Sequence, residues 1–316
     1  MTVPGLPMAV PSRDLPTRVR IHEVGARDGL QNEKATVPTE VKAEFIRRLD
    51  GAGLTTIEAT SFVHPKWVPQ LADAEQLFPM VSDLHAALPV LVPNERGLDR
   101  ALGLGARRVA VFASATESFA KANLNRTVDE ALAMFEPVVS RAKAASVHVR
   151  GYLSMCFGDP WEGAVPIPQV VKVCRALLDM GCDELSLGDT IGVATPGHVV
   201  ALLAALDEAG VPPTALGVHF HDTYGQALAN TLAALQQGVT TVDASAGGLG
   251  GCPYAKSATG NLATEDLVWM LRGLGIDTGI DLGRLVATST WMAAQLGRPS
   301  PSRTVRALSH EDTEEH

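Results

Sequence analysis

Short apolar runs alternate along the chain with longer segments whose apolar residues recur at helical spacing. The runs are rich in β-branched and aliphatic residues and return at intervals of roughly 20 to 40 residues, which is typical of strands separated by helices. Eight strands are predicted on this basis, at Val19–Val24, Thr55–Thr60, Ala86–Val92, Arg108–Ala113, Val147–Leu153, Glu184–Leu187, Ala215–His221 and Thr241–Ala244.

The segments between the runs have one apolar face and one polar face. In Glu40–Leu54, the residues Val41, Phe45 and Leu49 follow helical spacing, whereas Lys42 is expected to face water with the other charged residues. Comparable helices are predicted at Thr127–Ala145, Pro168–Met180, Pro196–Ala209 and Gly225–Gln237.

Regular alternation of strands and helices produces a parallel sheet with right-handed crossovers. Eight such units in fewer than 300 residues favour a closed (β/α)8 TIM barrel over an open doubly wound sheet. No linker or shift in composition divides the chain. We therefore predict one α/β domain, with a barrel over residues 19–298, an N-terminal tail over 1–18 and a C-terminal tail over 299–316.

Composition narrows the class of protein. The chain has 316 residues, 26 basic and 35 acidic side chains and a net charge of −9, and 46% of its residues are hydrophobic. This apolar content excludes a disordered chain. Net acidity argues against nucleic acid and anionic membranes as partners. Neither a secretory signal nor a spanning segment is visible, so a cytoplasmic location is expected.

Reactive side chains of a (β/α)8 barrel lie where its strands end, at the carboxyl rim. Several polar residues of this chain are predicted there. They are Arg27, Asp28 and Gln31 after the first strand, Glu58 near the end of the second, Asp189 after the sixth, His219 and His221 on the seventh, and Cys252 and Asn261 after the eighth.

The pair His219 and His221 is the clearest chemical signal. Residues two apart on a strand face the same side, so both imidazoles can reach one divalent ion. Asp28 is the natural third ligand and Asn261 a candidate oxygen ligand. Nitrogen and oxygen ligands without thiolates favour Mg²⁺ or Mn²⁺ over a structural zinc site, although zinc can occupy such a set. The alternative is a hydrogen-bonded structural pair.

Arg27 and Glu58 each have two interpretations. Arg27 either forms an ion pair with Asp28 that closes a tight loop, or stabilises a developing oxyanion beside the metal. Glu58 lies in an apolar strand and is costly there unless it is paired, for which Arg27 is the expected partner. Glu58 either forms a buried structural pair of this kind or has a direct catalytic role. Asp189 is either a residue at a helix N-terminus or a carboxylate of the rim.

The four cysteines divide by context. Cys252 lies in a glycine-rich loop, Gly247–Tyr254, that suits a mobile lid, and its thiol is either an acid or nucleophile or an idle group. Cys174 and Cys182 lie in or just after a predicted helix and are expected to be packing residues. Cys156 follows the fifth strand, and its role stays open.

These residues stand in motifs that resemble 3-hydroxy-3-methylglutaryl-CoA lyase. The similar segments are VRIHEVGARDGLQN at 19–32, IEATSFVHPKWVP at 57–69, SLGDTIGVATPG at 186–197, HFHDTYGQALAN at 219–230 and GGLGGCPYAKSATGNLATED at 247–266. The resemblance extends from about Val19 to about Arg298. The loop at Met155–Asp159 matches the lyase pattern only loosely, so a related acyl-CoA substrate with a different 3-substituent is an alternative.

The resemblance implies a reaction and roles for residues. A 3-hydroxyacyl-CoA would be cleaved to acetyl-CoA and a 3-keto acid, with Mg²⁺ or Mn²⁺ as cofactor, as in leucine degradation. The metal ligands would be Asp28, His219, His221 and Asn261. The catalytic residues would be Arg27, Glu58, Asp28 and Cys252, and the substrate-binding residues Arg27, Gln31, Lys34, Tyr152 and Asp189. The general base would be Asp28 or a water.

Two rival functions remain at this point. A Claisen-type synthase would condense acetyl-CoA with a 2-keto acid, and a non-catalytic barrel would use the metal structurally or bind a partner. Synthases of this kind usually carry an added C-terminal region, for which the chain leaves no room after the barrel. Analogy with the family further implies a homodimer.

Overall fold

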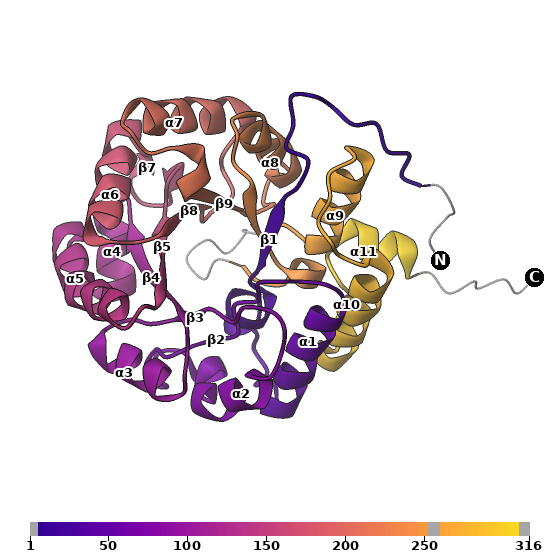
Figure 1. The fold of residues 1–316 in the computed structure, drawn as a ribbon, viewed down its shortest axis with the longest axis horizontal. Coiled ribbons are helices and arrows are strands. Elements are labelled where there is room, and N and C mark those ends of the chain that lie inside the picture. Colours follow the sequence, from indigo (N-terminus) through magenta and orange to yellow (C-terminus); the bar gives the residue numbers. More distant parts are fainter. Residues whose placement is uncertain (1–5, 252–259, 310–316) are drawn as a thin grey trace, which may run out of the picture.

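The computed structural model describes residues 6–251 and 260–309, and they form a ring of eight parallel strands inside a ring of helices (Figure 1). The strands follow the order β1-β10-β9-β8-β5-β4-β3-β2. Their bounds are β1 Arg20–Glu23, β2 Thr60–Ser61, β3 Val90–Leu91, β4 Arg108–Ser114, β5 His148–Ser154, β8 Glu184–Asp189, β9 Leu216–Phe220 and β10 Thr241–Ala244.

The ring closes at β1, which has a neighbour on each side. β1 pairs with β10 along its whole length, and a single bridge between Glu23 and Ile57 joins β1 to the residues just before β2. The prediction of a single-domain (β/α)8 barrel is confirmed. All eight predicted strand positions lie on this ring, so the carboxyl ends of the strands meet at one rim.

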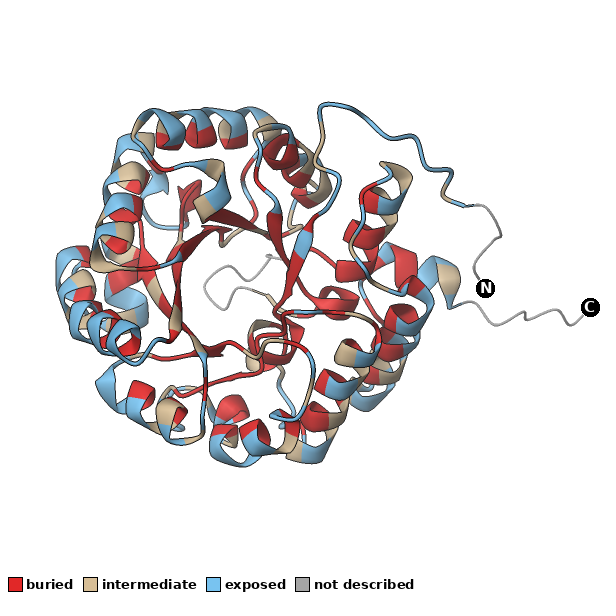
Figure 2. Cartoon of the chain, in the orientation of Figure 1, coloured by how far each residue is buried: buried red, intermediate tan, exposed pale blue. Residues whose placement is uncertain are grey.

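Helices cover the outside of the sheet, and Figure 2 shows their buried residues on the side that faces the strands. This follows from the amphipathic pattern of the sequence. The helix bounds are α1 Thr39–Gly51, α2 Ala74–Val81, α3 Glu95–Gly103, α4 Glu117–Leu124, α5 Val128–Ala144, α6 Ile167–Met180, α7 Pro196–Glu208, α8 Ala227–Gln236, α9 Thr264–Gly273, α10 Leu282–Leu296 and α11 Arg303–Leu308.

Two local expectations need correction. The second strand, predicted at Thr55–Thr60, is regular only from Thr60, because Thr56 and Ile57 each make only an isolated bridge. Lys42 does not face water, as it is buried against α2 and its Nζ lies 2.9 Å from Asp73 Oδ1. The charge of Asp73 makes this buried ammonium tolerable, and the helical pattern of α1 alone does not reveal such a partner.

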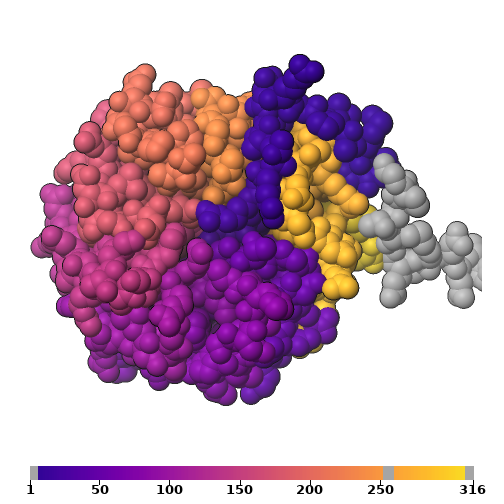
Figure 3. Space-filling model, in the orientation of Figure 1, coloured from indigo at the N-terminus to yellow at the C-terminus, as the bar shows by residue number. Residues whose placement is uncertain are grey.

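The described parts of both termini contact the barrel. On the face shown in Figure 3, the N-terminal residues run across the surface beside the C-terminal helices, where the amide of Val10 donates to the carbonyl of Gly273. Beyond Arg298, Ser302 donates to Asp266 of α9, and α11 packs against α9 and α10. No helix of residues 6–251 or 260–309 has the length and apolar character needed to cross a membrane.

Candidate active site

Three side chains at the carboxyl rim bring ligand atoms within 4.8 Å of one another: Asp28, His219 and His221. His219 lies on β9 and His221 directly follows the strand, so both imidazoles face the barrel interior. Asp28 lies in the π-helical turn η1 (Gly25–Gly29), which begins two residues after β1. The predicted HxH pair and the predicted third ligand are therefore brought together by β1 and β9.

Asn261 completes this cluster. Its amide nitrogen donates to Asp28 Oδ2 at 2.8 Å and to the carbonyl of Leu249 at 3.0 Å. Its Oδ1 and Nδ1 of His221 are buried and form no hydrogen bond of good geometry among the described residues, although the Asn261 side chain lies close enough to His221 to act on its pKa. Buried polar atoms are rarely left without a partner unless a ligand supplies one. One carboxylate, two imidazoles and an amide oxygen suit a divalent cation, so these four residues fit the metal that the sequence predicts.

The electrostatic state of the cluster also suits a cation. Burial tends to raise the pKa of Asp28, but Arg27 and the two histidines outweigh it and hold that pKa below its usual value. Burial and the charge of His219 lower the pKa of His221 to about 4. Asp28 is thus ionised and His221 neutral near pH 7, the forms in which these side chains bind metals.

Arg27 lies next to the cluster and is almost fully buried. Its Nη1 donates to Asp28 Oδ1 at 2.8 Å, and its Nε donates to Glu58 Oε2 at 2.9 Å. Burial opposes the charge of Arg27, but Glu58 and Asp28 overcome it and raise the pKa of the guanidinium. Arg27 therefore has both partners expected for it, the adjacent Asp28 and the strand carboxylate Glu58.

Glu58 is fully buried and uses one oxygen for all its contacts. Oε2 accepts from Arg27 and, at 3.0 Å, from the hydroxyl of Tyr152, whereas Oε1 has no hydrogen-bond partner in the described part of the chain. Burial raises the pKa of Glu58 although Arg27 opposes this shift. Tyr152 lies on β5 with the guanidinium of Arg27 over its ring, 5.4 Å from the centroid. The Tyr152 hydroxyl therefore helps to fix the position of the Glu58 carboxylate through this hydrogen bond.

Polar side chains of β5, β8, β9 and β10 bond to one another inside the barrel, and only one of them, His219, was predicted from the sequence. Asp243 of β10 lies opposite His219, with Oδ2 at 3.2 Å from His219 Nδ1, and it pairs with Arg150 of β5 at 2.7 Å. A lone charged residue within an apolar strand was the signal that identified Glu58. The same signal is present at Val149-Arg150-Gly151 and Val242-Asp243-Ala244.

The contacts among Arg150, Asp243 and His219 shift the pKa values of Asp243 and His219. Burial tends to raise the pKa of Asp243, but Arg150 and the bond from His219 hold it far below its usual value. Burial likewise tends to lower the pKa of His219, and the bond to Asp243 reverses that direction. The carboxylate of Asp243 is therefore ionised at neutral pH.

The remaining predicted substrate-binding residues occupy different environments. Asp189 ends β8 and is buried, and its two oxygens accept from the amides of Val193 at 2.9 Å and Ala194 at 3.0 Å. Burial raises its pKa to about 6. It thus closes the turn that precedes α7. Gln31 is half-buried after η1, and Lys34 is exposed in the loop that follows.

Two buried carboxylates hold the base of the glycine-rich loop. Glu23 Oε1 accepts from the amides of Gly25 and Ala246, so it joins η1 to the 3-10 turn η4 (Ala246–Gly248). Glu265 of α9 accepts from the amide of Gly247 at 2.9 Å. Burial raises the pKa of Glu23 to about 7 and that of Glu265 to about 8. The prediction for Cys252 lies outside the described residues.

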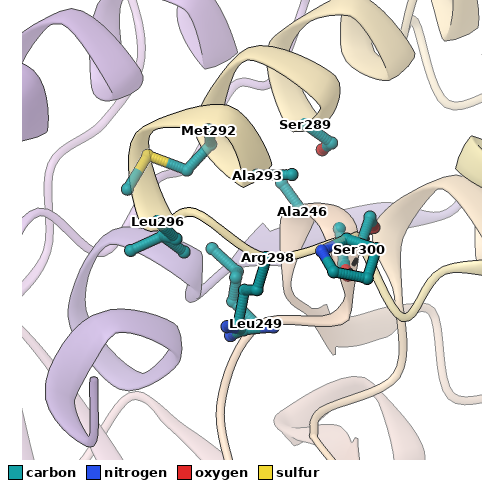
Figure 4. A pocket seen from close by; sticks show the side chains of 10 residues that line it. Ala246, Leu249, Ser289, Met292, Ala293, Leu296, Arg298 and Ser300 are labelled. Atoms are coloured by element: carbon teal, nitrogen blue, oxygen red, sulfur yellow. Dashed lines mark hydrogen bonds between the residues drawn. The ribbon is translucent and has the colours of Figure 1, made fainter. Parts of the chain in front are cut away.

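A small pocket lies between α10 and the η4 loop, as Figure 4 shows. It contains none of the three clustered metal-ligand candidates and lies behind the base of the glycine-rich loop. Its lining residues are Ala246, Gly247, Leu249, Ser289, Met292, Ala293, Leu296, Arg298, Pro299 and Ser300.

The three described cysteines are free and buried. Burial raises the pKa of Cys174 and Cys182 to about 12 and that of Cys156 well above its usual value. Thiols with raised pKa values are poor nucleophiles. Cys174 and Cys182 therefore match the expected packing residues, and Cys156 donates to the carbonyl of Leu153.

A closed parallel barrel with a cluster of imidazoles and a carboxylate at its carboxyl rim is an arrangement that can hold a divalent cation. The HMGL-like family model matches residues 18–292. The chain belongs to the HMGL-like family.

Individual relatives agree with this assignment. A mitochondrial hydroxymethylglutaryl-CoA lyase of Arabidopsis thaliana is 55% identical over 96% of this chain, and the chain spans 64% of that relative. A mitochondrial hydroxymethylglutaryl-CoA lyase of Rattus norvegicus is 52% identical over 93% of this chain, which spans 90% of that relative. The crystal structure of a hydroxymethylglutaryl-CoA lyase from Pseudomonas aeruginosa superimposes with a TM-score of 0.91 at 47% identity, covering 93% of this chain and 98% of that structure.

Proposed function

We propose that the protein is a divalent-metal-dependent carbon–carbon lyase that cleaves 3-hydroxy-3-methylglutaryl-CoA to acetyl-CoA and acetoacetate. The observation that carries the proposal is the convergence of Asp28, His219, His221 and Asn261 beside the buried pair of Arg27 and Glu58. Relatives about half identical over most of the chain bear the name of this lyase.

Asp28, His219, His221 and Asn261 would hold Mg²⁺ or Mn²⁺. When bound, such an ion supplies a Lewis acid that acidifies the 3-hydroxyl of the substrate. The buried Oδ1 of Asn261, next to His221, and the neutral imidazole of His221 support this ligand set.

The chain's own residues then act on the two ends of the breaking bond. A base, Asp28 or a water, takes the proton of the 3-hydroxyl, and the bond between C2 and C3 breaks as the 3-keto group forms. The electron pair remains on the acetyl-CoA fragment as an enolate. Arg27, which is always charged, stabilises the thioester oxygen where that negative charge develops.

Protonation of the enolate carbon yields acetyl-CoA, and we assign this step to the thiol of Cys252. Glu58 orients Arg27, and Tyr152 holds Glu58 through the hydroxyl. Gln31 and Lys34 follow the Arg27 turn in sequence and would contact the CoA ester, Lys34 through its positive charge. For Asp189, the bonds to two backbone amides favour a role in shaping the turn after β8 that borders the substrate site.

The test is acetyl-CoA formation from 3-hydroxy-3-methylglutaryl-CoA by the purified protein, before and after EDTA, and again after addition of Mg²⁺ or Mn²⁺. We expect activity that is lost with EDTA and restored by either ion. Release of free CoA thiol from acetyl-CoA and a 2-keto acid, without cleavage of the hydroxyacyl-CoA, would instead identify a synthase. Absence of both reactions would identify a non-catalytic barrel.

Assembly and location complete the proposal. We propose a homodimer by analogy with the family, which light scattering would report as twice the chain mass of 33.3 kDa. We also propose that the protein resides in the cytoplasm, in keeping with its free thiols. Subcellular fractionation of the tagged protein tests that location.

A further inference from the structure

The imidazole of His219 is held by a carboxylate that belongs to neither the metal cluster nor the pair of Arg27 and Glu58. In the register of the sheet, Asp243 of β10 is the direct partner of His219 on β9. Asp243 Oδ2 lies 3.2 Å from Nδ1 of His219, and the side chain of Asp243 has no exposed surface. The opposite ring nitrogen, Nε2, remains for the metal.

Asp243 is itself fixed from two other strands. Its Oδ1 accepts from Arg150 Nη2 of β5 at 2.7 Å, and its Oδ2 also accepts from the hydroxyl of Ser186 on β8 at 2.8 Å. The space around this contact is full, because a Cβ on Gly217 of β9 would lie 2.7 Å from Arg150 Nη2. Arg150 therefore packs directly against the backbone of β9 at Gly217.

These contacts determine which nitrogen of His219 carries the proton. A carboxylate that is paired with a buried guanidinium is ionised and can only accept hydrogen bonds. Ser186 and His219 must therefore both donate to it, so the proton of a neutral His219 lies on Nδ1. Nε2 then keeps its lone pair, which is what a metal ligand needs.

We propose that Asp243, fixed by Arg150 and Ser186, is a positioning residue that sets the tautomer and orientation of His219 for the divalent ion. This inference rests on the metal site proposed above. Replacing a carboxylate that accepts a hydrogen bond from a metal-bound histidine typically lowers metal affinity by about 10–100-fold. An Asn at position 243 can turn its amide N–H toward Nδ1, which would move the histidine proton to Nε2.

The experiment compares Mn²⁺ binding, followed by the electron paramagnetic resonance signal of the free ion, in the full-length parent, Asp243→Asn and Glu184→Gln. Glu184 Oε1 lies 3.1 Å from Arg150 Nε, and Glu184 does not bond to His219. Its variant therefore disturbs the same buried charges but leaves the hydrogen bond between Asp243 and the His219 imidazole in place. We expect Asp243→Asn to weaken Mn²⁺ binding by about 10–100-fold. Glu184→Gln should bind Mn²⁺ as the parent does, even if its melting temperature falls equally.

The outcomes separate the two proposals. If the parent binds no Mn²⁺, the metal site itself is wrong. If the parent binds Mn²⁺ and Asp243→Asn binds it equally well, or Glu184→Gln weakens it as much, Asp243 has only a structural role. Histidine ¹⁵N spectra of the metal-free parent give a second readout that does not depend on any variant folding. In spectra recorded at a pH where His219 is neutral, a proton on Nδ1 of His219 supports the inference, and a proton on Nε2 overturns it.

Discussion

Two nitrogens of the Arg27 guanidinium contact the same carboxylate oxygen of Glu58. Nε lies 2.9 Å and Nη2 lies 2.8 Å from Oε2. The third nitrogen of the guanidinium, Nη1, donates to Asp28. The planar guanidinium is therefore bound on two sides by carboxylates, Asp28 from the turn after β1 and Glu58 from the residues just before β2. A lysine at this position would carry the same charge but could not make the same three bonds.

We expect Arg27→Lys to lower turnover of 3-hydroxy-3-methylglutaryl-CoA by about 10²–10³-fold, the usual effect of removing one donor to a developing oxyanion. Metal binding should persist, because Asp28 and both histidines remain. Steady-state kinetics together with Mn²⁺ titration measure the two effects. Arg48→Lys, a change in a partly exposed helical pair with Glu44, is the control. Turnover of Arg27→Lys close to that of Arg48→Lys would exclude a direct role for Arg27.

His219→Ala should lose both metal and activity, because it removes one of the three clustered ligands. His198→Ala, on the outer helix α7 and away from the cluster, should retain both. Metal content after dialysis against Mn²⁺, measured by atomic emission, distinguishes the two variants. Retention of stoichiometric metal by His219→Ala would count against its assignment as a ligand.

Cys252→Ala should lose turnover and keep the metal, because a proton donor is removed while the four ligands are unchanged. Cys182→Ala provides the matched control, since that thiol is buried just after α6 with its pKa raised by burial. Acetyl-CoA formation and Mn²⁺ affinity are measured on both variants. Normal turnover in Cys252→Ala would remove the thiol from the mechanism.

Gly250→Ala should weaken metal binding through Asn261. Gly250 has φ of +112°, and a Cβ there would lie 2.5 Å from Asn261 Nδ2. Gly210 has φ of +82° with nothing within 4 Å of such a Cβ, so Gly210→Ala carries backbone strain without the collision. Mn²⁺ affinity should therefore fall in Gly250→Ala alone, whereas thermal melting should show destabilisation in both. Equal Mn²⁺ affinity in the two variants would contradict the placement of Asn261 in the cluster.

Glu265 should make the folded state less stable as the pH rises. Its pKa is raised from 4.5 to about 8 in the folded protein, so the folded state binds more protons than the unfolded one between these values. Its contribution to stability is present below about pH 4.5 and is lost as the pH rises through about 8. Relative to Glu265→Gln, the parent should lose free energy of unfolding across this range in denaturant titrations.

A matched control for this pH dependence is Glu136→Gln, at an exposed position of α5. The difference in unfolding free energy between this variant and the parent should stay flat over the same range. A flat difference for Glu265→Gln would show that Glu265 is ionised throughout.

The sequence was sufficient for the barrel because strands and helices follow local patterns, and for the cluster of Asp28, His219 and His221 because a barrel brings all its strand ends to one rim. Alternation predicts the strands, and spacing of two on one strand brings His219 and His221 to the same face. Lys42 and Asp243 were misjudged or missed for the opposite reason. Their partners, Asp73 and Arg150, lie 31 and 93 residues away, and only the packing of separate elements shows that these charges are compensated. For Glu58 the same signal was interpreted correctly because Arg27 had already been placed at the rim.

The closure of the ring between β1 and β10 has a consequence for how the protein is made. Asp28 follows the first strand, whereas His219 and His221 belong to β9 and Asn261 comes after β10. A chain emerging from the ribosome therefore carries Asp28 long before the other three proposed ligands are synthesised. The proposed cation site therefore cannot be complete before β9 and β10 have been made and β10 has paired with β1.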